Sequence, residues 1–166
     1  MKKIIALLLL IVATIGCDRV TKRMAETSLA GLPRTSLMAD TVRLEYAENT
    51  GGFLSLGAEL PASVRTPLFT IGTGLGLLAM IVAAVRLQWR GLQLAALCLF
   101  AAGGASNWAD RLVRGSVVDF LNVGFGPVRT GIFNVADVAV MAGACLLLFS
   151  QVRADRTPTG SEDAAP

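Results

Sequence analysis

The fold is decided by residues 92–111, which read LQLAALCLFAAGGASNWADR. A membrane-spanning helix needs roughly 20 predominantly apolar residues. The run that begins at Leu92 reaches this length when its helix continues beyond Trp108 into Asp110 and Arg111. The segment therefore predicts a transmembrane helix that carries ionisable side chains at one end.

The rest of the chain has the same apolar character. Of its 166 residues, 54% are hydrophobic and 16% are charged, whereas a soluble domain usually carries about 25% charged residues. Three further apolar segments run from Ile4 to Cys17, from about Thr66 to Val85 and from Gly131 to Val152. We therefore predict a membrane all-α fold with four transmembrane helices, in a single domain over residues 1–152.

The first apolar segment admits two interpretations. Its basic start, its apolar run and the Ala13–Cys17 stretch resemble a lipoprotein signal peptide that would be cut before Cys17. Asp18 and Lys22 favour a longer helix instead, because opposite charges four residues apart face each other on one helix. A helix that continues to about Arg23 reaches spanning length, with the Asp18–Lys22 pair near one membrane face.

Basic residues orient the predicted helices. Lys2 and Lys3 at the start, together with the short Arg86–Arg90 turn, favour a cytoplasmic N-terminus by the positive-inside rule. The total Lys and Arg counts on the two sides do not favour this orientation by themselves. Four crossings then return the chain to the cytoplasm, where we predict a disordered tail over residues 153–166.

A small sheet is expected outside the membrane. Thr41–Ala47 alternates apolar and polar residues, as a half-buried strand does, and Asn49–Gly52 follows as a turn. Val117–Val123 is rich in strand-forming residues and could lie beside the first strand. We expect a small external β-cradle, built from about residues 24–64 and 113–130, resting on the helices.

Composition narrows the chemistry. The sequence has no histidine, which excludes Ser–His and Cys–His nucleophiles and the common zinc sites. Its three cysteines lie far apart in apolar stretches, so we expect no metal and no cofactor. The net charge of +3 is small and scattered, which argues against a nucleic-acid partner. Asp, Glu, Lys, Tyr and Cys remain as the groups that could titrate.

Ionisable residues at membrane depth are costly and are functional candidates. Three acidic side chains stand at the expected external ends of the last two helices: Asp110, Asp119 and Asp137. Asp110 shares one helical face with its polar neighbours Asn107, Arg111 and Arg114. Either arginine could neutralise Asp110, so we favour a structural ion pair over catalysis at this position.

The other two aspartates could form a pair. A chain that returns from the third helix to the fourth can bring Asp119 against Asp137, which shares a helical face with Asn134. Two carboxylates in one low-dielectric site tend to share a proton, as in aspartic proteases. In the structural alternative, Asp119 caps a turn and Asp137 hydrogen-bonds within the bundle. Spacing alone does not decide between the two.

Five pieces of the chain form an ordered set of motifs: DRVTK from Asp18, NTGGFLS from Asn49, GGASNWADR from Gly103, GSVVDF from Gly115 and FNVAD from Phe133. Together they resemble the lipoprotein signal peptidase (signal peptidase II) family. The match spans Asp18 to about Val140, which is most of the chain. One such piece would be a weak signal, whereas five in order among four apolar segments are specific.

The resemblance implies a membrane aspartyl endopeptidase that removes signal peptides from prolipoproteins by cutting before a diacylglyceryl-modified cysteine. It implies an active site at the outer face of the bacterial inner membrane, with the lipid-modified prolipoprotein and membrane lipid as partners, and we expect a monomer. The family's catalytic aspartates fall on Asp119 and Asp137. Supporting or substrate-binding positions fall on Asn49, Asn107, Asp110, Arg111, Asn134, Asp18 and Lys22.

The chain departs from the family's usual pattern in three places. Ser106 stands where Gly is usual, Phe53-Leu54-Ser55 where Ala-Phe-Ser is usual, and Gly131 where Pro is common. Both carboxylates are kept, so the departures bear on substrate fit more than on chemistry. The alternatives are a divergent inactive paralogue and a non-catalytic membrane scaffold or transporter subunit.

Overall fold

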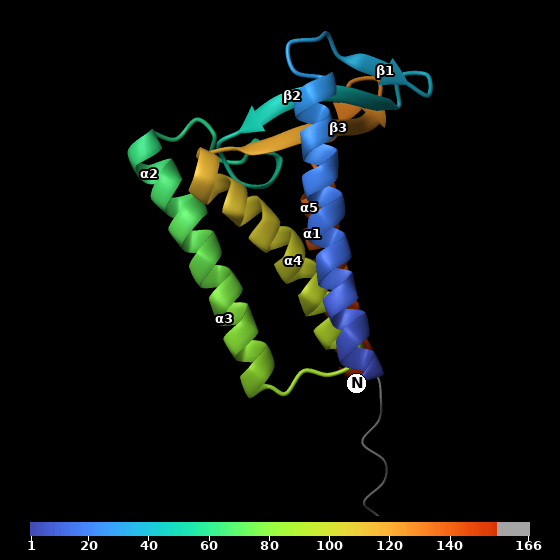
Figure 1. Cartoon of the computed structure of the whole chain (residues 1–166), viewed down its shortest axis with the longest axis vertical. Coiled ribbons are helices and arrows are strands. Elements are labelled where there is room, and N and C mark those ends of the chain that lie inside the picture. Colours follow the sequence, from blue (N-terminus) through green and yellow to red (C-terminus); the bar gives the residue numbers. More distant parts are fainter. Residues whose placement is uncertain (156–166) are drawn as a thin grey trace, which may run out of the picture.

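The computed structural model describes residues 1–155 and contains four helical crossings (Figure 1). Helix α1 spans Lys2–Ser28, α4 spans Leu92–Arg114 and α5 spans Val135–Asp155. The remaining crossing joins α2 (Ala62–Pro67), one π-helical turn, η2 (Leu68–Gly72), and α3 (Thr73–Arg86). All four crossings are long and apolar enough to span a membrane, which confirms the predicted fold class.

The helix ends differ from the predicted apolar segments for identifiable reasons. Helix α1 passes unbroken through Cys17 and ends at Ser28. The π-helical turn follows Pro67, whose ring and missing N–H disturb the regular helical pattern. Helix α5 begins at Val135 and not at the predicted Gly131, because Phe133 exchanges backbone hydrogen bonds with Leu121 of a neighbouring strand.

Four antiparallel strands form the sheet in the order β1-β2-β3-β4. Strands β1 (Thr35–Leu37) and β4 (Val128–Arg129) are short edge strands that the sequence did not reveal. The central strands β2 (Val42–Asn49) and β3 (Val117–Phe125) pair as predicted, with Ala47 opposite Asp119 and Asn49 opposite Val117. All four strands lie within the predicted ranges 24–64 and 113–130.

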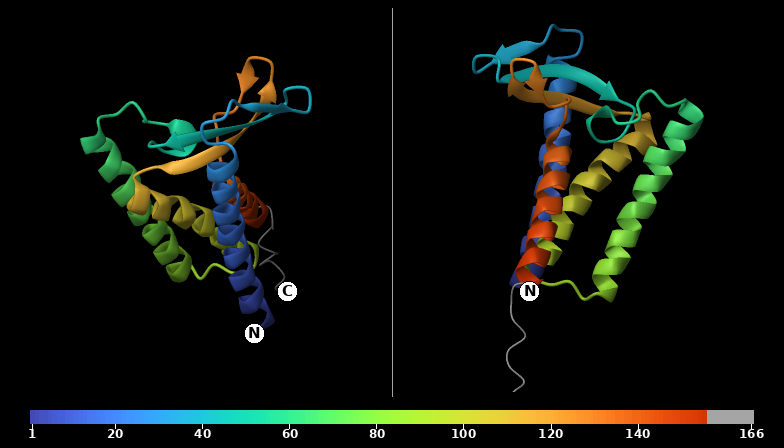
Figure 2. Two further views of the ribbon diagram at one scale, coloured as in Figure 1. Left: turned by 45° about the horizontal axis from the view of Figure 1, so that its top comes forward. Right: turned by 180° about the vertical axis from the view of Figure 1, so that it is seen from behind.

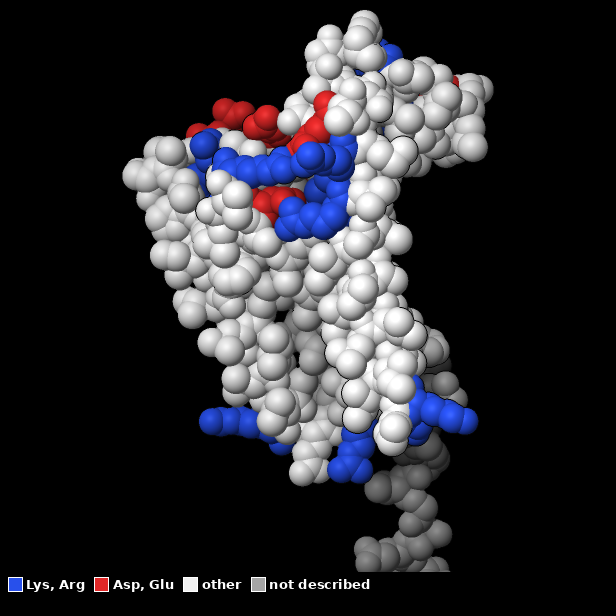
Figure 3. Space-filling model, viewed as in Figure 1, with Lys and Arg blue, Asp and Glu red and all other residues white. Residues whose placement is uncertain are grey.

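The sheet covers one end of the helices, and the N-terminus lies at the opposite end (Figures 1 and 2). Helix α3 stands apart from α1, whereas α4 and α5 run closely together through the bundle. Figure 3 shows a broad band without charged side chains between the charged sheet end and a basic opposite end. This distribution is the one expected of a chain that crosses a bilayer.

Glycines bring α4 and α5 into close contact. A Cβ atom at Gly143 would lie 2.6 Å from the backbone nitrogen of Phe100 and 2.7 Å from the carbonyl oxygen of Ala96. A Cβ at Gly103 would collide with the carbonyl oxygen of Ala136 at the start of α5. Helices approach this closely only where side chains are absent, and the approach sets polar groups of α4 against the first turn of α5.

The structure describes only the first part of the predicted disordered tail over residues 153–166. The backbone of residues 153–155 continues α5, whereas residues 156–166 of the predicted tail lie outside the described residues.

Candidate active site

Asp119 and Asp137 come from different layers of the molecule. Asp119 lies on β3, in the central pair of strands, and its residue is 1% exposed. Asp137 lies in the first turn of α5 and is 6% exposed. The chain between them turns back through β4 and the Leu121–Phe133 bridge, which sets the start of α5 beneath β3.

Asn134, immediately before α5, links the two carboxyl groups. Its side-chain Nδ2 donates to Asp119 Oδ1 at 2.6 Å, and its backbone N–H donates to Asp137 Oδ2 at 3.1 Å. Its Oδ1 accepts the backbone N–H of Asp137 at 2.9 Å. The reciprocal hydrogen bonds between Asn134 and Asp137 are those of a helix capping box. The capping box holds the Asp137 side chain in position, and the side-chain amide N–H of Asn134 remains available to donate to Asp119.

Two further asparagines complete the contacts of the pair. Asn49 donates to Asp119 Oδ2 at 2.9 Å, and Asn107 donates to Asp137 Oδ1 at 2.9 Å. Asn49 is held in place by its own turn, where it accepts the N–H of Gly51 and donates to the carbonyl of Gly52. Each carboxyl group therefore accepts two N–H donors from groups with fixed positions.

Burial raises the pKa of Asp119 to about 6. The hydrogen bonds from Asn49 and Asn134 oppose this shift in pKa, and the neighbouring charge of Asp137 adds to it. Asp119 therefore keeps its proton at a pH where an ordinary aspartate has lost it. Two carboxyl groups in such a site favour the state in which they share one proton.

The raised pKa has a measurable consequence for stability. The folded protein holds the proton of Asp119 more tightly than the unfolded chain, so the contribution of Asp119 to stability is fully present below about pH 4 and is lost as the pH rises through about 6. Asp119→Asn cannot titrate in this window. We expect its melting temperature, relative to that of the wild type, to rise by a few degrees between pH 4 and pH 7. A difference that does not change with pH would show that Asp119 ionises normally.

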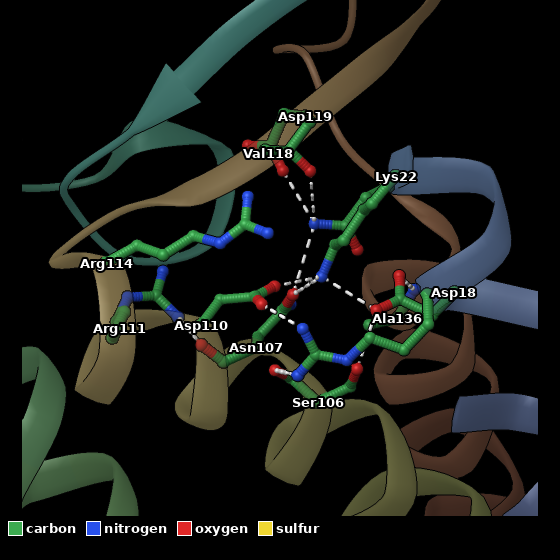
Figure 4. Close-up of polar contacts among 12 residues, drawn as sticks. Asp18, Lys22, Ser106, Asn107, Asp110, Arg111, Arg114, Val118, Asp119 and Ala136 are labelled. Atoms are coloured by element: carbon green, nitrogen blue, oxygen red, sulfur yellow. Dashed lines mark hydrogen bonds and ion pairs between the residues drawn. The ribbon is translucent and has the colours of Figure 1, made fainter. Parts of the chain in front are cut away.

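A buried charge cluster supports the pair from below. Lys22 is 4% exposed, and its Nζ lies 2.7 Å from carboxylate oxygens of both Asp18 and Asp110, which are 0% and 4% exposed. The same Nζ donates to Asn107 Oδ1 at 2.7 Å. Figure 4 shows these side chains converging from α1 and α4. The predicted Asp18–Lys22 pair is thereby confirmed, and it also orients the asparagine that contacts Asp137.

Asp18 in addition reaches the start of α5. Its Oδ1 accepts the backbone N–H of Ala136 at 2.9 Å, and its Oδ2 accepts the hydroxyl of Ser106 at 2.7 Å (Figure 4). The Ala136 N–H is one of the first four of a helix, which have no partner within the helix itself. Ser106 was noticed in the sequence only as a departure from a family pattern. The structure gives its hydroxyl a buried partner.

The predicted partners of Asp110 were wrong. Arg19 and Lys22 of α1 neutralise Asp110, and neither Arg111 nor Arg114 does so. Asp110 points across to α1, whereas Arg111 is turned about 100° around the helix and donates to the carbonyl of Gly51 at 2.5 Å. Arg114 pairs instead with Glu26 of α1. Arg19 could have been anticipated, because it shares a helical face with Lys22 three residues later.

The nine predicted site residues all lie at the sheet end of the helices. Asn49, Asn107 and Asn134 contact the carboxylate pair directly, whereas the cluster of Asp18, Lys22 and Asp110 touches it through Asn107. Arg111 holds the turn that contains Gly51. Residues missed by the sequence analysis are Arg19, Ser106 and the backbone of Ala136.

Two hollows meet at Asp137. One, of about 330 Å³, lies between α3, α4 and α5 and is lined by Phe69, Leu77, Asn107 and Arg111 as well as Asp137. The other, of about 480 Å³, is lined mainly by apolar side chains and runs along α5 past Val138 and Met141. Phe53 lines both. Asp137 therefore lines both hollows.

Comparison with known proteins identifies the family of the chain. A family model described as signal peptidase (SPase) II matches residues 10–153. The lipoprotein signal peptidase of Chlorobium phaeovibrioides (strain DSM 265 / 1930) is 34% identical over 166 residues, covering 93% of this chain and 95% of the relative. That of Pelodictyon phaeoclathratiforme (strain DSM 5477 / BU-1) is 31% identical over 168 residues, with 93% and 95% covered.

Solved structures share the fold. A bacterial membrane enzyme determined by the in meso method at 2.3 Å resolution superposes with a TM-score of 0.81 at 23% identity, covering 96% of this chain and 94% of that one. A second, at 1.9 Å resolution, gives a TM-score of 0.73 at 24% identity, with 89% and 93% covered. On the family model, the sequence relatives and the shared architecture together, this chain belongs to the signal peptidase II family, whose members are lipoprotein signal peptidases.

Proposed function

We propose that this chain is an aspartic endopeptidase that removes signal peptides from prolipoproteins by cutting immediately before the diacylglyceryl-modified cysteine, with Asp119 and Asp137 as the catalytic pair. The observation that carries the proposal is the double contact of Asn134, which bonds to both carboxyl groups at once. Both carboxyl groups, which are 1% and 6% exposed, therefore lie in one buried site.

The proposed reaction uses one water and one shared proton. The ionised carboxylate takes a proton from the water while the protonated carboxyl donates to the scissile carbonyl oxygen, and the water oxygen adds to the carbonyl carbon. The tetrahedral adduct then breaks its carbon–nitrogen bond. The proton taken from water passes to the leaving amine, and one hydroxyl of the adduct returns its proton to the carboxyl group that had donated to the carbonyl oxygen. The asparagine contacts hold both carboxyl groups still throughout, so little reorganisation accompanies the charge movement.

The two hollows at Asp137 fit an amphiphilic substrate. Each buried CH₂ group of a lipid contributes about 0.8 kcal/mol to membrane attachment, so the bilayer itself concentrates the modified cysteine at this depth. We assign the acyl chains to the groove between α3, α4 and α5, and the peptide to the space below the sheet. In this proposal the sheet end faces the outside, both termini are cytoplasmic, and the chain acts as a monomer in the bacterial inner membrane.

The proposal is tested with a prolipoprotein made with and without its diacylglyceryl group. Purified protein in lipid nanodiscs should release the signal peptide from the modified precursor, and mass spectrometry should find the lipid-bearing cysteine as the new first residue. The unmodified precursor is the matched control and should stay intact. Cleavage at another bond, equal cleavage of both precursors, or no cleavage of either would overturn the proposed function.

A further inference from the structure

A third hollow lies on the far side of the charge cluster from the carboxylate pair. It has a volume of about 430 Å³ and opens between α1, α4 and β3. Neither Asp119 nor Asp137 lines it, whereas Arg19, Arg23 and Arg114 do, together with Glu26 and Asp110. Figure 3 shows basic and acidic side chains gathered on this face directly beneath the sheet, above the band without charge.

The charges of this hollow leave a positive surplus. Arg19 pairs with Asp110, and Arg114 pairs with Glu26. Arg23 is exposed and forms no ion pair among the described residues. A guanidinium carries five N–H donors, so each paired arginine keeps donors for a further acceptor. The hollow therefore has three guanidinium groups that can donate hydrogen bonds to an anion with several oxygen atoms.

The depth of the hollow matches a lipid headgroup. Arg19 lies about 24 Å along α1 from Lys3, at 1.5 Å per residue, and a bilayer core is about 30 Å thick. Long basic side chains extend toward the interface, so the two ends of α1 carry basic residues at opposite membrane surfaces. Below Arg19, the same helical face carries Leu8 and Val12, which are exposed along the outside of the bundle.

We propose that this hollow binds an anionic glycerophospholipid of the outer leaflet, with its phosphodiester against Arg19, Arg23 and Arg114 and an acyl chain along Leu8 and Val12. Phosphate oxygens accept hydrogen bonds from arginine with matched geometry, and the surplus charge favours a lipid with net negative charge over a zwitterionic one. The diacylglyceryl group of the proposed substrate carries no phosphate, so this lipid site differs in chemistry from the substrate groove.

Native mass spectrometry of the detergent-purified full chain tests the site directly and needs no activity measurement. The probes are phosphatidylglycerol, phosphatidylcholine and uncharged diacylglycerol, added at equal concentration. We expect the wild type to retain phosphatidylglycerol in preference to both others. Arg23→Glu, at an exposed position that the fold does not depend on, should lower this retention at least roughly fivefold, and adding Arg19→Gln should lower it further.

The matched control is Arg34→Gln, which removes an exposed arginine from the loop before β1 and should leave lipid retention unchanged. Equal retention of diacylglycerol, or retention that Arg23→Glu does not alter, would overturn the proposal. Inorganic phosphate is added as a separate probe. Its binding without retention of phosphatidylglycerol would likewise overturn the proposal, because the occupant would then be a free anion and not a lipid.

Discussion

Asp137→Asn is expected to slow signal-peptide release by about a thousandfold or more, because the variant cannot take a proton from the attacking water. Asp119→Asn should lose activity to a similar extent, since the protonated carboxyl group that donates to the carbonyl oxygen is then missing. The double variant should be hardly slower than either single variant, because groups that act as a unit have non-additive effects. Release is measured as the rate of signal-peptide appearance in nanodiscs.

The control for this prediction is Asp40→Asn. Asp40 also lies at the sheet end, but its side chain is 44% exposed and it pairs with Arg43. Its amide variant should cleave at nearly the wild-type rate. Melting curves should show that all these variants remain folded, so that a loss of rate reports on chemistry. Full activity of either catalytic-pair variant would refute the aspartic mechanism, and a scaffold function would survive both changes.

Parts of this fold follow from the sequence because the membrane imposes simple requirements. The residue 92–111 segment needs an apolar length and a helical backbone, and both are readable from composition. The pairing of β2 with β3 follows from strand patterning on either side of the third helix. The exact start of α5 does not, because Phe133 has a strand partner that no local pattern reveals.

The candidate site likewise has a part that the sequence predicts and a part that it does not. Asn134 and Asp137 form a capping box three residues apart, a local motif visible in the sequence. Contacts between distant segments are not visible in this way. The choice of Arg19 over Arg111 as a partner of Asp110 depends on which side of α4 faces α1, and no local pattern shows this because Arg19 and Asp110 lie 91 positions apart in the sequence.

Lys22→Met is expected to give the largest loss of stability among single changes in the charge cluster. Removing one member of a buried ion pair typically costs about 3–5 kcal/mol, because the remaining charge stays buried without compensation. Asp110 would keep Arg19, whereas Asp18 would keep only the Ala136 N–H and the Ser106 hydroxyl. We therefore expect about 3 kcal/mol, measured by denaturant unfolding in detergent.

Two comparisons separate this buried cluster from an ordinary surface pair. Arg43→Met removes one of the two ion partners of Asp40 and leaves Arg129 at 3.6 Å. Because the Asp40 side chain is 44% exposed, this change should cost about 1 kcal/mol or less, since solvent screens such pairs. Neutralising the acids as well, in Asp18→Asn/Lys22→Met/Asp110→Asn, should recover part of the stability lost in Lys22→Met, because no uncompensated charge then remains buried. If the triple variant is less stable than Lys22→Met alone, the cluster stabilises the fold through its hydrogen bonds and not through charge balance.

In both Lys22→Met and the triple variant, Asn107 keeps the hydrogen bond that it accepts from Asn134. The rate of signal-peptide release should therefore fall much less than in Asp137→Asn.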